Sequence, residues 1–249
     1  MQIAYRTAIG KRRQDNEDSI GIFTNQSGVT LAIIADGIGG NQGGDVASEM
    51  AVAHMGHSFQ PTTVKTIDET KNWLQNQISS ENQDIRDRSE QYLDLKGMGT
   101  TVVLTVIFDQ TVLIGNIGDS RAYLLRDHVF SQVTEDHSLV NELVKRGELS
   151  KQAARVHPQK NVITRSLGIE KAVQIDMHYL ELTDNDMLLL CSDGLSDMVN
   201  DDQIQAVLES DAALQAKCDE LIKLANDAGG LDNISCLLYT SDAADDGES

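Results

Sequence analysis

The sequence predicts an α+β protein in which antiparallel sheets are covered by helices, and three observations support this. Short apolar runs rich in Ile and Leu recur along the chain, which is typical of strands buried on both faces. The β-branched segments 100–108, 112–117 and 121–125 are separated by short turns and indicate an antiparallel meander. Segments 45–59 and 67–91 carry apolar residues at helical spacing on one side only, as helices that cover a core do.

The remaining elements follow from the same patterns. Residues 2–8, 19–24 and 31–36 read as strands at the start of the chain. The stretch 138–167 has a weaker, mixed pattern and predicts short helices and loops. The last third of the chain predicts strands at 173–182 and 187–191, a helix at 214–225 that Gly229-Gly230 ends, and a final strand at 234–239.

Length, charge and cysteine content limit the class of protein. A chain of 249 residues suits one large domain or two small ones, and neither an internal repeat nor a Pro/Ser-rich linker argues for two. The formal net charge of -19 argues against nucleic acid or an anionic membrane surface as a partner and favours cations. Without an apolar run of membrane-spanning length or a leader-like start, we expect a cytoplasmic protein. The three widely spaced cysteines predict reduced, buried thiols.

Four aspartates stand at the ends of predicted strands. Asp36, Asp119 and Asp193 each follow an apolar run, and Asp232 comes just before one. An aspartate before glycine is also ordinary turn chemistry, so any one of them alone favours a turn. Four together favour a shared site, where strands side by side bring the carboxylates to one end of a sheet. Such a cluster is unfavourable unless cations bind it.

The residue types narrow the choice of cation. The chain has neither a His-x-x-x-His nor a Cys-x-x-Cys pattern, and an all-oxygen set suits Mg²⁺ or Mn²⁺. Gly37 lacks a Cβ, so its carbonyl can approach a metal closely. A pair of such ions roughly 4 Å apart can activate a water for in-line attack on phosphorus. Arg12 and Arg13 could hold the phosphoryl oxygens, although from the residues alone a solvated basic pair is the simpler interpretation.

Seven short motifs, in order, resemble those of the metal-dependent serine/threonine protein phosphatases, the PPM or PP2C family, and most of all its small bacterial members. The resemblance runs from the start of the chain to about Tyr239. The motifs are Arg13–Asp18, Asp36–Gly40, Gly99–Thr101, Gly118–Tyr123, Thr134–Ser138, Ser192–Gly194 and Asp232-Asn233.

The resemblance implies a four-layer αββα sandwich of two antiparallel sheets flanked by helices, with the site in a cleft at one edge. Residues 1–240 would form the phosphatase domain, and a flap at about 145–167 would influence substrate choice. The acidic end, 241–249, is expected to be a disordered or non-native tail.

The resemblance also implies roles for the acids. Asp36 would bridge two Mn²⁺ or Mg²⁺ ions, the Gly37 carbonyl would bind one of them, and Asp193 and Asp232 would complete the protein ligands. Asp119, with Asp193, matches the position that holds a third metal in bacterial members.

Four further residues receive supporting or catalytic roles by the same resemblance. Arg13 would bind the substrate phosphate and act with Asp36 and Asp193 in catalysis. Glu17 and Asp18 would act mostly through water molecules on the metals, and Asn233 would support the ligands. Phosphorylated proteins are then the expected substrates of a monomeric enzyme, and a cognate Ser/Thr protein kinase is its expected antagonist.

Two positions depart from the family pattern. Ile38 stands where animal members have His after Asp-Gly, and Asn41 stands where many bacterial relatives have His. The sequence therefore leaves the general acid unidentified, with water on a metal as an alternative proton donor. His137 is expected to organise a helix start with the neighbouring Ser138 rather than to perform catalysis.

Three alternative functions fit the sequence less well. An ATP-binding module of the histidine-kinase/Hsp90 type would need Gly at position 38 and gives no role to Asp193 or Asp232. A non-catalytic phosphopeptide-binding pseudophosphatase would have lost a ligand, whereas the four aspartates are intact. A cysteine phosphatase built on Cys191 would need Arg six residues on, where the chain has Asp197.

Overall fold

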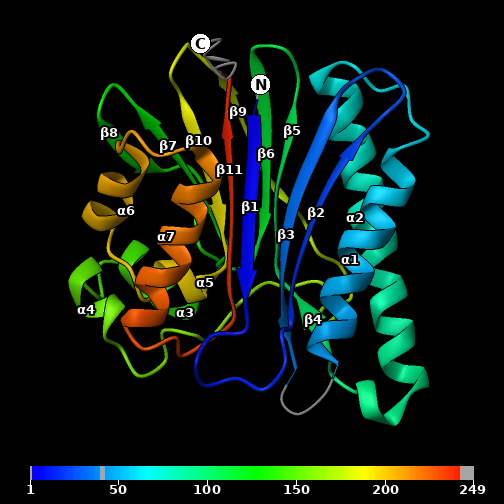
Figure 1. Cartoon of the computed structure of the whole chain (residues 1–249). Helices are drawn as coiled ribbons and strands as arrows, with labels where there is room; N and C mark the ends of the chain where they lie inside the picture. Colours follow the sequence, from blue (N-terminus) through cyan, green and yellow to red (C-terminus); the bar gives the residue numbers. More distant parts are fainter. Residues whose placement is uncertain (1, 40–42, 242–249) are drawn as a thin grey trace.

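Two antiparallel sheets pack face to face, and helices cover the outer face of each (Figure 1). The computed structural model describes residues 2–39 and 43–241. The predicted four-layer sandwich is confirmed. The expectations for Asn41 and for the tail after Ser241 lie outside the described residues.

Every strand pair in the described ladders is antiparallel. The first sheet has the order β1 (Gln2–Ala8), β11 (Ile234–Thr240), β10 (Met187–Cys191), β7 (Arg121–Arg126) and β8 (Val129–Gln132). The second has the order β2 (Asp18–Thr24), β3 (Thr30–Ile38), β5 (Val102–Ile107), β6 (Thr111–Ile117) and β9 (Asp176–Glu181), with the short β4 (Gly99–Thr100) paired to β3.

The helices divide between the two outer faces. The helices α1 (Gly44–Phe59) and α2 (Ile67–Gln91) cover the second sheet, and α6 (Asp201–Leu208) and α7 (Leu214–Asp227) cover the first. Four short helices complete the described chain: η1 (Leu93–Leu95), α3 (Leu139–Lys145), α4 (Lys151–Arg155) and α5 (Asp193–Ser196).

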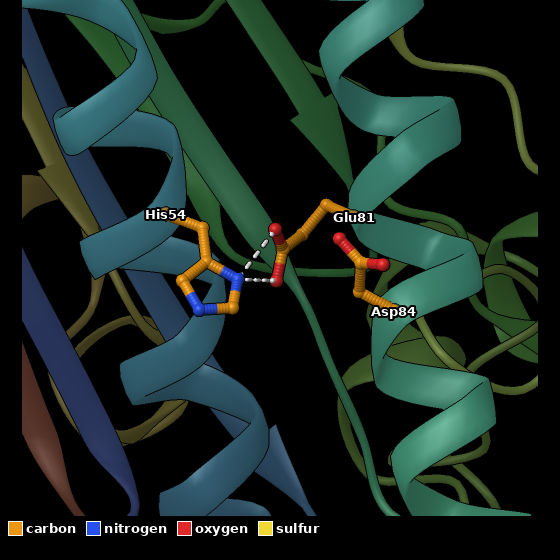
Figure 2. A group of neighbouring side chains, drawn as sticks. All are labelled: His54, Glu81 and Asp84. Atoms are coloured by element: carbon orange, nitrogen blue, oxygen red, sulfur yellow. Dashed lines mark hydrogen bonds and ion pairs between the residues drawn. The ribbon is translucent and has the colours of Figure 1, made fainter.

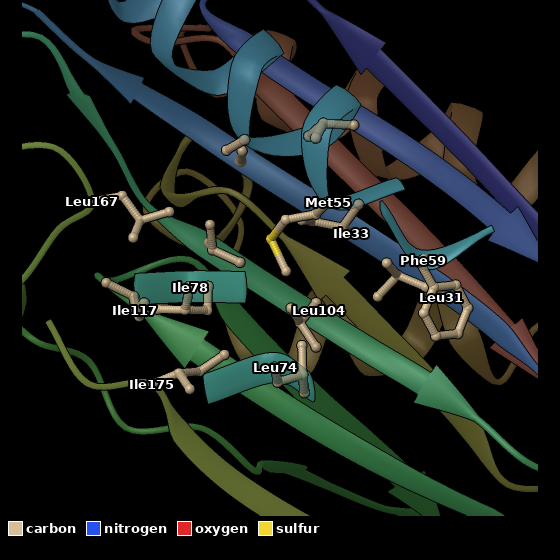
Figure 3. Close-up of a cluster of buried hydrophobic side chains, with 14 of the residues drawn as sticks. Leu31, Ile33, Met55, Phe59, Leu74, Ile78, Leu104, Ile117, Leu167 and Ile175 are labelled. Atoms are coloured by element: carbon tan, nitrogen blue, oxygen red, sulfur yellow. The ribbon is translucent and has the colours of Figure 1, made fainter. Parts of the chain in front are cut away.

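The alternation of side chains in the strands explains why the apolar runs are continuous. In β3, Leu31 and Ile33 point to the cluster under α1 and α2, which includes Met55 and Leu74 (Figure 3). The intervening Ala32 and Ile34 belong to a second cluster, between the two sheets. Because successive side chains of a strand point to opposite faces, a strand inside a four-layer sandwich needs apolar residues on both.

The path from β6 to β7 corrects the predicted meander. Residues 121–125 were expected to continue the antiparallel series of 100–117, but β7 pairs with β8 and β10 in the other sheet. The chain crosses between the sheets at Gly118, which has a φ of 101°. A β-branched pattern predicts a strand but does not determine its neighbour, which is why the prediction failed. The helix α6 and the strand β8 were not predicted.

The cysteine prediction is confirmed, because Cys191, Cys218 and Cys236 are all buried free thiols. Burial raises the pKa of Cys191 to about 12. Within residues 2–39 and 43–241, no helix has both the length and the apolar composition that crossing a bilayer requires.

A buried carboxyl group lies between the two helices of one outer layer. Glu81 in α2 is fully buried, and both its oxygens lie 3.1–3.2 Å from Nδ1 of His54 in α1, with Asp84 one turn along (Figure 2). Burial raises the pKa of Glu81 to about 7, and the neighbouring imidazole acts in the opposite direction. Replacing Glu81 therefore tests how a carboxyl group buried between α1 and α2 affects the stability of the protein.

We predict that Glu81→Gln stabilises the protein more at pH 8 than at pH 5. The pKa of Glu81 is higher in the folded state than in the unfolded state. The stability that protonated Glu81 contributes is thus fully present below pH 4.5 and is lost as the pH rises through about 7. Gln resembles the protonated acid but does not titrate. The free energy of unfolding in urea should favour the variant by about 1–3 kcal/mol more at pH 8 than at pH 5.

Glu90→Gln, in the same helix but exposed, is the control and should show no such pH-dependent difference. Equal effects of Glu81→Gln at the two pH values would contradict the prediction.

Candidate functional site

Five aspartates converge where strands of both sheets end. Asp36 lies on the same side of β3 as Ala32 and Ile34, facing the other sheet, and Asp18 is its register partner in β2. The other three come from elements that follow β6, follow β10 and precede β11: Asp119, Asp193 and Asp232. Burial first, and then the charges of the other four, raise the pKa of Asp36, as expected for carboxylates that lie close together.

This convergence corrects the predicted arrangement. The carboxylates were expected at one end of a single sheet, but Asp36 belongs to the second sheet, whereas Asp193 and Asp232 adjoin strands of the first. The run ending at Asp36 also does not stop there, because β3 continues to Ile38. The acids therefore face one another across the space between the sheets.

Within this cluster Asp18 and Asp119 are buried, the other three aspartates are half-buried, and several carboxylate oxygens have no hydrogen-bond partner. Burial raises the pKa of Asp18 to about 6 and that of Asp119 to about 7. For Asp36 and Asp193, burial first and then neighbouring carboxylates raise the pKa well above its usual range. Oδ1 of Asp18, Asp119 and Asp193 is buried without a hydrogen-bond partner. Unused carboxylate oxygens in a compact acidic cluster fit hard divalent cations.

Two glycines allow the backbone segments around the acids to pack closely. A Cβ on Gly37 would lie 2.2 Å from the carbonyl oxygen of Gly44, at the start of α1. A Cβ on Gly194 would lie 1.9 Å from the carbonyl oxygen of Asn233. Because these distances are far below van der Waals contact, only glycine allows the segments carrying Asp36, Asp193 and Asp232 to approach as they do.

Arg13 and Glu17 come from the loop between β1 and β2. One guanidinium nitrogen of Arg13 lies 2.8 Å from Oδ2 of Asp232, and the other lies 3.6 Å from Oε2 of Glu17. The side chain of Arg13 is 45% exposed. Its cationic group therefore lies at the solvent edge of the acidic cluster, with a defined orientation.

Asn233 organises this loop. Its side-chain Nδ2 donates to the carbonyl oxygens of Ile9 and Asp15, both at 2.9 Å. Its Oδ1 accepts from the backbone N–H of Glu17, also at 2.9 Å. One amide side chain thus satisfies three backbone groups of the loop that carries Arg13.

Three hydroxyl residues at the site were not predicted. Thr101 Oγ1 accepts from the backbone N–H of Asp36 at 3.0 Å and lies 2.8 Å from Ser120 Oγ. Ser192 Oγ donates to Oδ2 of Asp18 at 2.8 Å. All three lie inside the short motifs that carry the family resemblance. Their positions in those motifs indicated that they could belong to the site. A hydroxyl group carries no charge, however, so the sequence does not indicate which group it contacts.

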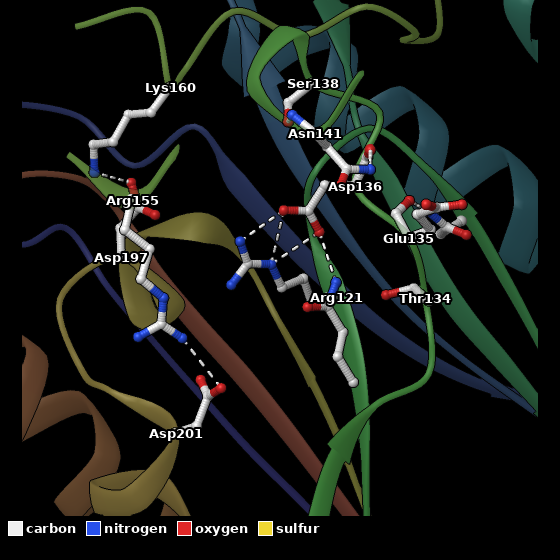
Figure 4. Close-up of polar contacts among 12 residues, drawn as sticks. Arg121, Thr134, Glu135, Asp136, Ser138, Asn141, Arg155, Lys160, Asp197 and Asp201 are labelled. Carbon is white, nitrogen blue, oxygen red and sulfur yellow. Dashed lines mark hydrogen bonds and ion pairs between the residues drawn. The ribbon is translucent and has the colours of Figure 1, made fainter. Parts of the chain in front are cut away.

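A cavity of about 680 Å³ adjoins the acids, and Asp119 and Asp193 line it. Its lining also includes Arg155 and Lys160 from the segment after α3, where Arg155 pairs with Asp201 at 3.1 Å and Lys160 pairs with Asp197 (Figure 4). A second cavity of about 450 Å³ lies beside the end of α2 and Gly168, and none of the five aspartates lines it. The first cavity is therefore the one that a substrate of this site would occupy.

Comparison with known proteins identifies the family. A family model described as protein phosphatase 2C matches residues 8–238. The serine/threonine phosphatase stp of Listeria monocytogenes is 45% identical over 248 residues, 99% of this chain and 98% of its own. The chain belongs to the protein phosphatase 2C family, so the predicted resemblance is confirmed.

Solved structures agree with this membership. The S. agalactiae serine/threonine phosphatase superposes with a TM-score of 0.92 at 41% identity, covering 96% of this chain and 99% of its own. The catalytic domain of the phosphatase PstP, in complex with two manganese ions, superposes with a TM-score of 0.82 at 32% identity, covering 95% and 96%. The fold around the acidic cluster is thus shared with a relative that binds metal.

We predict that Asn233→Ala loosens the loop that carries Arg13. Three backbone groups lose their partner, which should lower the free energy of unfolding by about 1–3 kcal/mol. Because Lys11, Arg12 and Arg13 lie in this loop, limited trypsin digestion of the folded variant should cut there faster than in the unchanged protein.

Asn25→Ala provides a matched control. Asn25 binds the backbone N–H groups of Ser27 and Val29 and the carbonyl of Val64 in a different loop. It should destabilise the protein comparably without increasing cleavage at residues 11–13. Equal cleavage rates in the two variants would show that Asn233 does not hold the loop.

Proposed function

We propose that this protein is a metal-dependent phosphatase that removes phosphate from phosphoserine and phosphothreonine in proteins. The observation that carries the proposal is the cluster of aspartates with buried, unused oxygens, beside an arginine at the solvent edge. Relatives across the whole chain are named serine/threonine phosphatases, which supports the same chemistry.

The proposed metal ligands are those of the acidic cluster. Asp36, the carbonyl of Gly37, Asp193 and Asp232 would hold two Mn²⁺ or Mg²⁺ ions, with Asp36 shared between them. Asp119 and Asp193, whose Oδ1 atoms both have no hydrogen-bond partner, would hold a third. Two such ions supply a strongly acidified water as the nucleophile for in-line attack on phosphorus, so no covalent enzyme intermediate is needed.

The protein's own groups then position the reactants. Arg13, already oriented by Asp232 and Glu17, presents further N–H donors on its exposed side to the phosphoryl oxygens. Glu17 and Asp18 would act through water molecules near the ions, and Ser192 fixes the Asp18 carboxylate. Asn233 keeps the loop of Arg13 in place. The cavity beside Asp119 and Asp193 would receive the phosphorylated segment.

The alternative functions are less well supported. An ATP-binding module of the histidine-kinase/Hsp90 type would leave Asp193 and Asp232 without a purpose, and the family match does not favour it. A pseudophosphatase would lack part of the donor set, but all five aspartates are present and grouped. Hydrolysis is the function that uses every charged group of the site.

The wider biological setting is also a proposal. We propose that residues 1–240 act as one catalytic domain, that the flap at about 145–167 influences substrate choice, and that a Ser/Thr protein kinase is the antagonist. A monomer in the cytoplasm is the expected form. The net charge of -19 supports protein rather than nucleic-acid or membrane partners.

We predict hydrolysis of p-nitrophenyl phosphate that requires added Mn²⁺ and stops with EDTA. Asp36→Asn and Asp193→Asn should each lower kcat about 100-fold or more, because charge stabilisation by metal ions is worth several kcal/mol. The measurement is steady-state kinetics over a range of Mn²⁺ concentrations.

Asp84→Asn, in α2 and outside the cluster, makes the same chemical change and should keep the full rate. Full turnover in metal-free buffer would refute metal dependence, and a fully active Asp193→Asn would refute its assignment as a ligand.

We predict that Arg13→Ala mainly raises KM for phosphorylated substrates, by about 10-fold or more, since a charge-assisted hydrogen bond is worth about 1.5–3 kcal/mol. Arg13→Lys should recover only part of this, because lysine cannot bind two oxygens through a planar fork. Arg12→Ala is the control. The role of Arg13 would be contradicted by a KM equal to that of the unchanged protein.

A further inference from the structure

His137 binds both polar backbone groups of the residue that precedes Asp119. It lies between β8 and α3, and only 4% of its surface is exposed. Nδ1 of its ring accepts from the backbone N–H of Gly118 at 3.0 Å. The backbone N–H of His137 in turn donates to the Gly118 carbonyl at 2.9 Å. The expectation that His137 merely helps to begin a helix is therefore incomplete: Ser138 caps α3, while the imidazole holds Gly118.

The hydrogen bonds fix the tautomer of this ring. Because the Gly118 N–H can only donate, Nδ1 must be the acceptor, and the ring proton is on Nε2. Nε2–H then donates to Oδ2 of Asp176 at 3.0 Å, and Oδ1 of Asp176 accepts from Arg165 at 2.6 Å. Burial lowers the pKa of His137, which is consistent with a neutral ring, although Asp176 acts in the opposite direction.

The turn that His137 holds determines where Asp119 points. Gly118 has a φ of 101°, and a Cβ there would lie 2.6 Å from the side chain of Thr101. On the other side of Asp119, Ser120 Oγ lies 2.8 Å from Thr101 Oγ1. Oδ1 of Asp119 itself is buried without a hydrogen-bond partner. The direction of its carboxylate therefore depends on the backbone at 118–120, which His137 and Thr101 hold from two sides.

We propose that His137, protonated at Nε2, is a positioning residue that holds the Gly118 turn and so directs the Asp119 carboxylate to the third metal ion. The inference rests on the proposed function. The same residue also connects this turn to the end of the flap, because the backbone N–H of Thr164 donates to the His137 carbonyl at 2.8 Å. The ion pair of Asp176 with Arg165 reinforces that connection.

Two substitutions separate the two hydrogen bonds of the ring. In His137→Asn, the amide oxygen can take the place of Nδ1 and accept from Gly118. In His137→Gln, the longer side chain can reach Asp176 but leaves the Gly118 N–H without its acceptor. Calorimetric titration of each full-length variant with Mn²⁺ should show the weakest of three ions bound at least 10-fold less tightly in His137→Gln. His137→Asn should stay within about 3-fold of the unchanged protein.

Two reference variants calibrate this titration. Asp119→Ala should bind two Mn²⁺ ions and thus show the loss of the third site. His178→Gln, in the neighbouring strand β9, makes the same chemical change outside the network and should bind all three ions. Equal Mn²⁺ affinities in His137→Gln and the unchanged protein would overturn the inference while leaving the two-metal enzyme intact. If the unchanged protein binds no Mn²⁺ and has no activity, the proposed function fails, and this inference fails with it.

A measurement on the metal-free protein provides an independent test. ¹⁵N spectra of the His137 ring should show a protonated Nε2 and an unprotonated Nδ1. The Gly118 amide should exchange with solvent more slowly in the unchanged protein and in His137→Asn than in His137→Gln. A proton on Nδ1 would overturn the inference even if the Gln variant failed to fold.

Discussion

The repulsion among five aspartates in a partly buried cluster is the constraint on which the rest of the structure depends. Carboxyl groups in a space with little water ionise only at a free-energy cost, and here each one raises that cost for Asp36. The fold sustains the arrangement because apolar layers on both sides of each sheet supply the stability that the acids remove. Metal ions bound there would offset this repulsion, and ions that bind only the folded protein would stabilise it.

Backbone contacts, rather than long side chains, set the geometry of the cluster. Gly37 and Gly194 let three segments approach one another, and Asn233 and Thr101 satisfy backbone groups beside the acids. His137 extends this principle to Asp119 through Gly118. Such contacts fix the direction of each charge, and charges that are positioned in advance are what a transition state needs.

Much of the fold could be predicted because its signals are local. The runs before Asp36 and Asp193 are apolar on both faces, and the long helix 67–91 has one apolar side, so strands and helices were predicted close to their observed bounds. Pairing is not local, and so the crossing of the chain at Gly118 from one sheet to the other was missed. The same limit applies to Thr101 and Asp176, whose partners come from distant segments.

The acids come from both sheets, and this has a mechanical consequence. Each sheet is held together by its own ladder of hydrogen bonds, whereas side-chain packing, including Ile34 and Leu190, and side-chain hydrogen bonds such as that from Arg126 to the Glu181 carbonyl join one sheet to the other. A small sliding or parting of the sheets would leave the secondary structure intact but pull Asp36 away from Asp193. Ions bound between Asp36 and Asp193 would oppose such a movement, because they would connect the two sheets. The geometry of the catalytic centre therefore depends directly on how the two sheets are placed relative to each other.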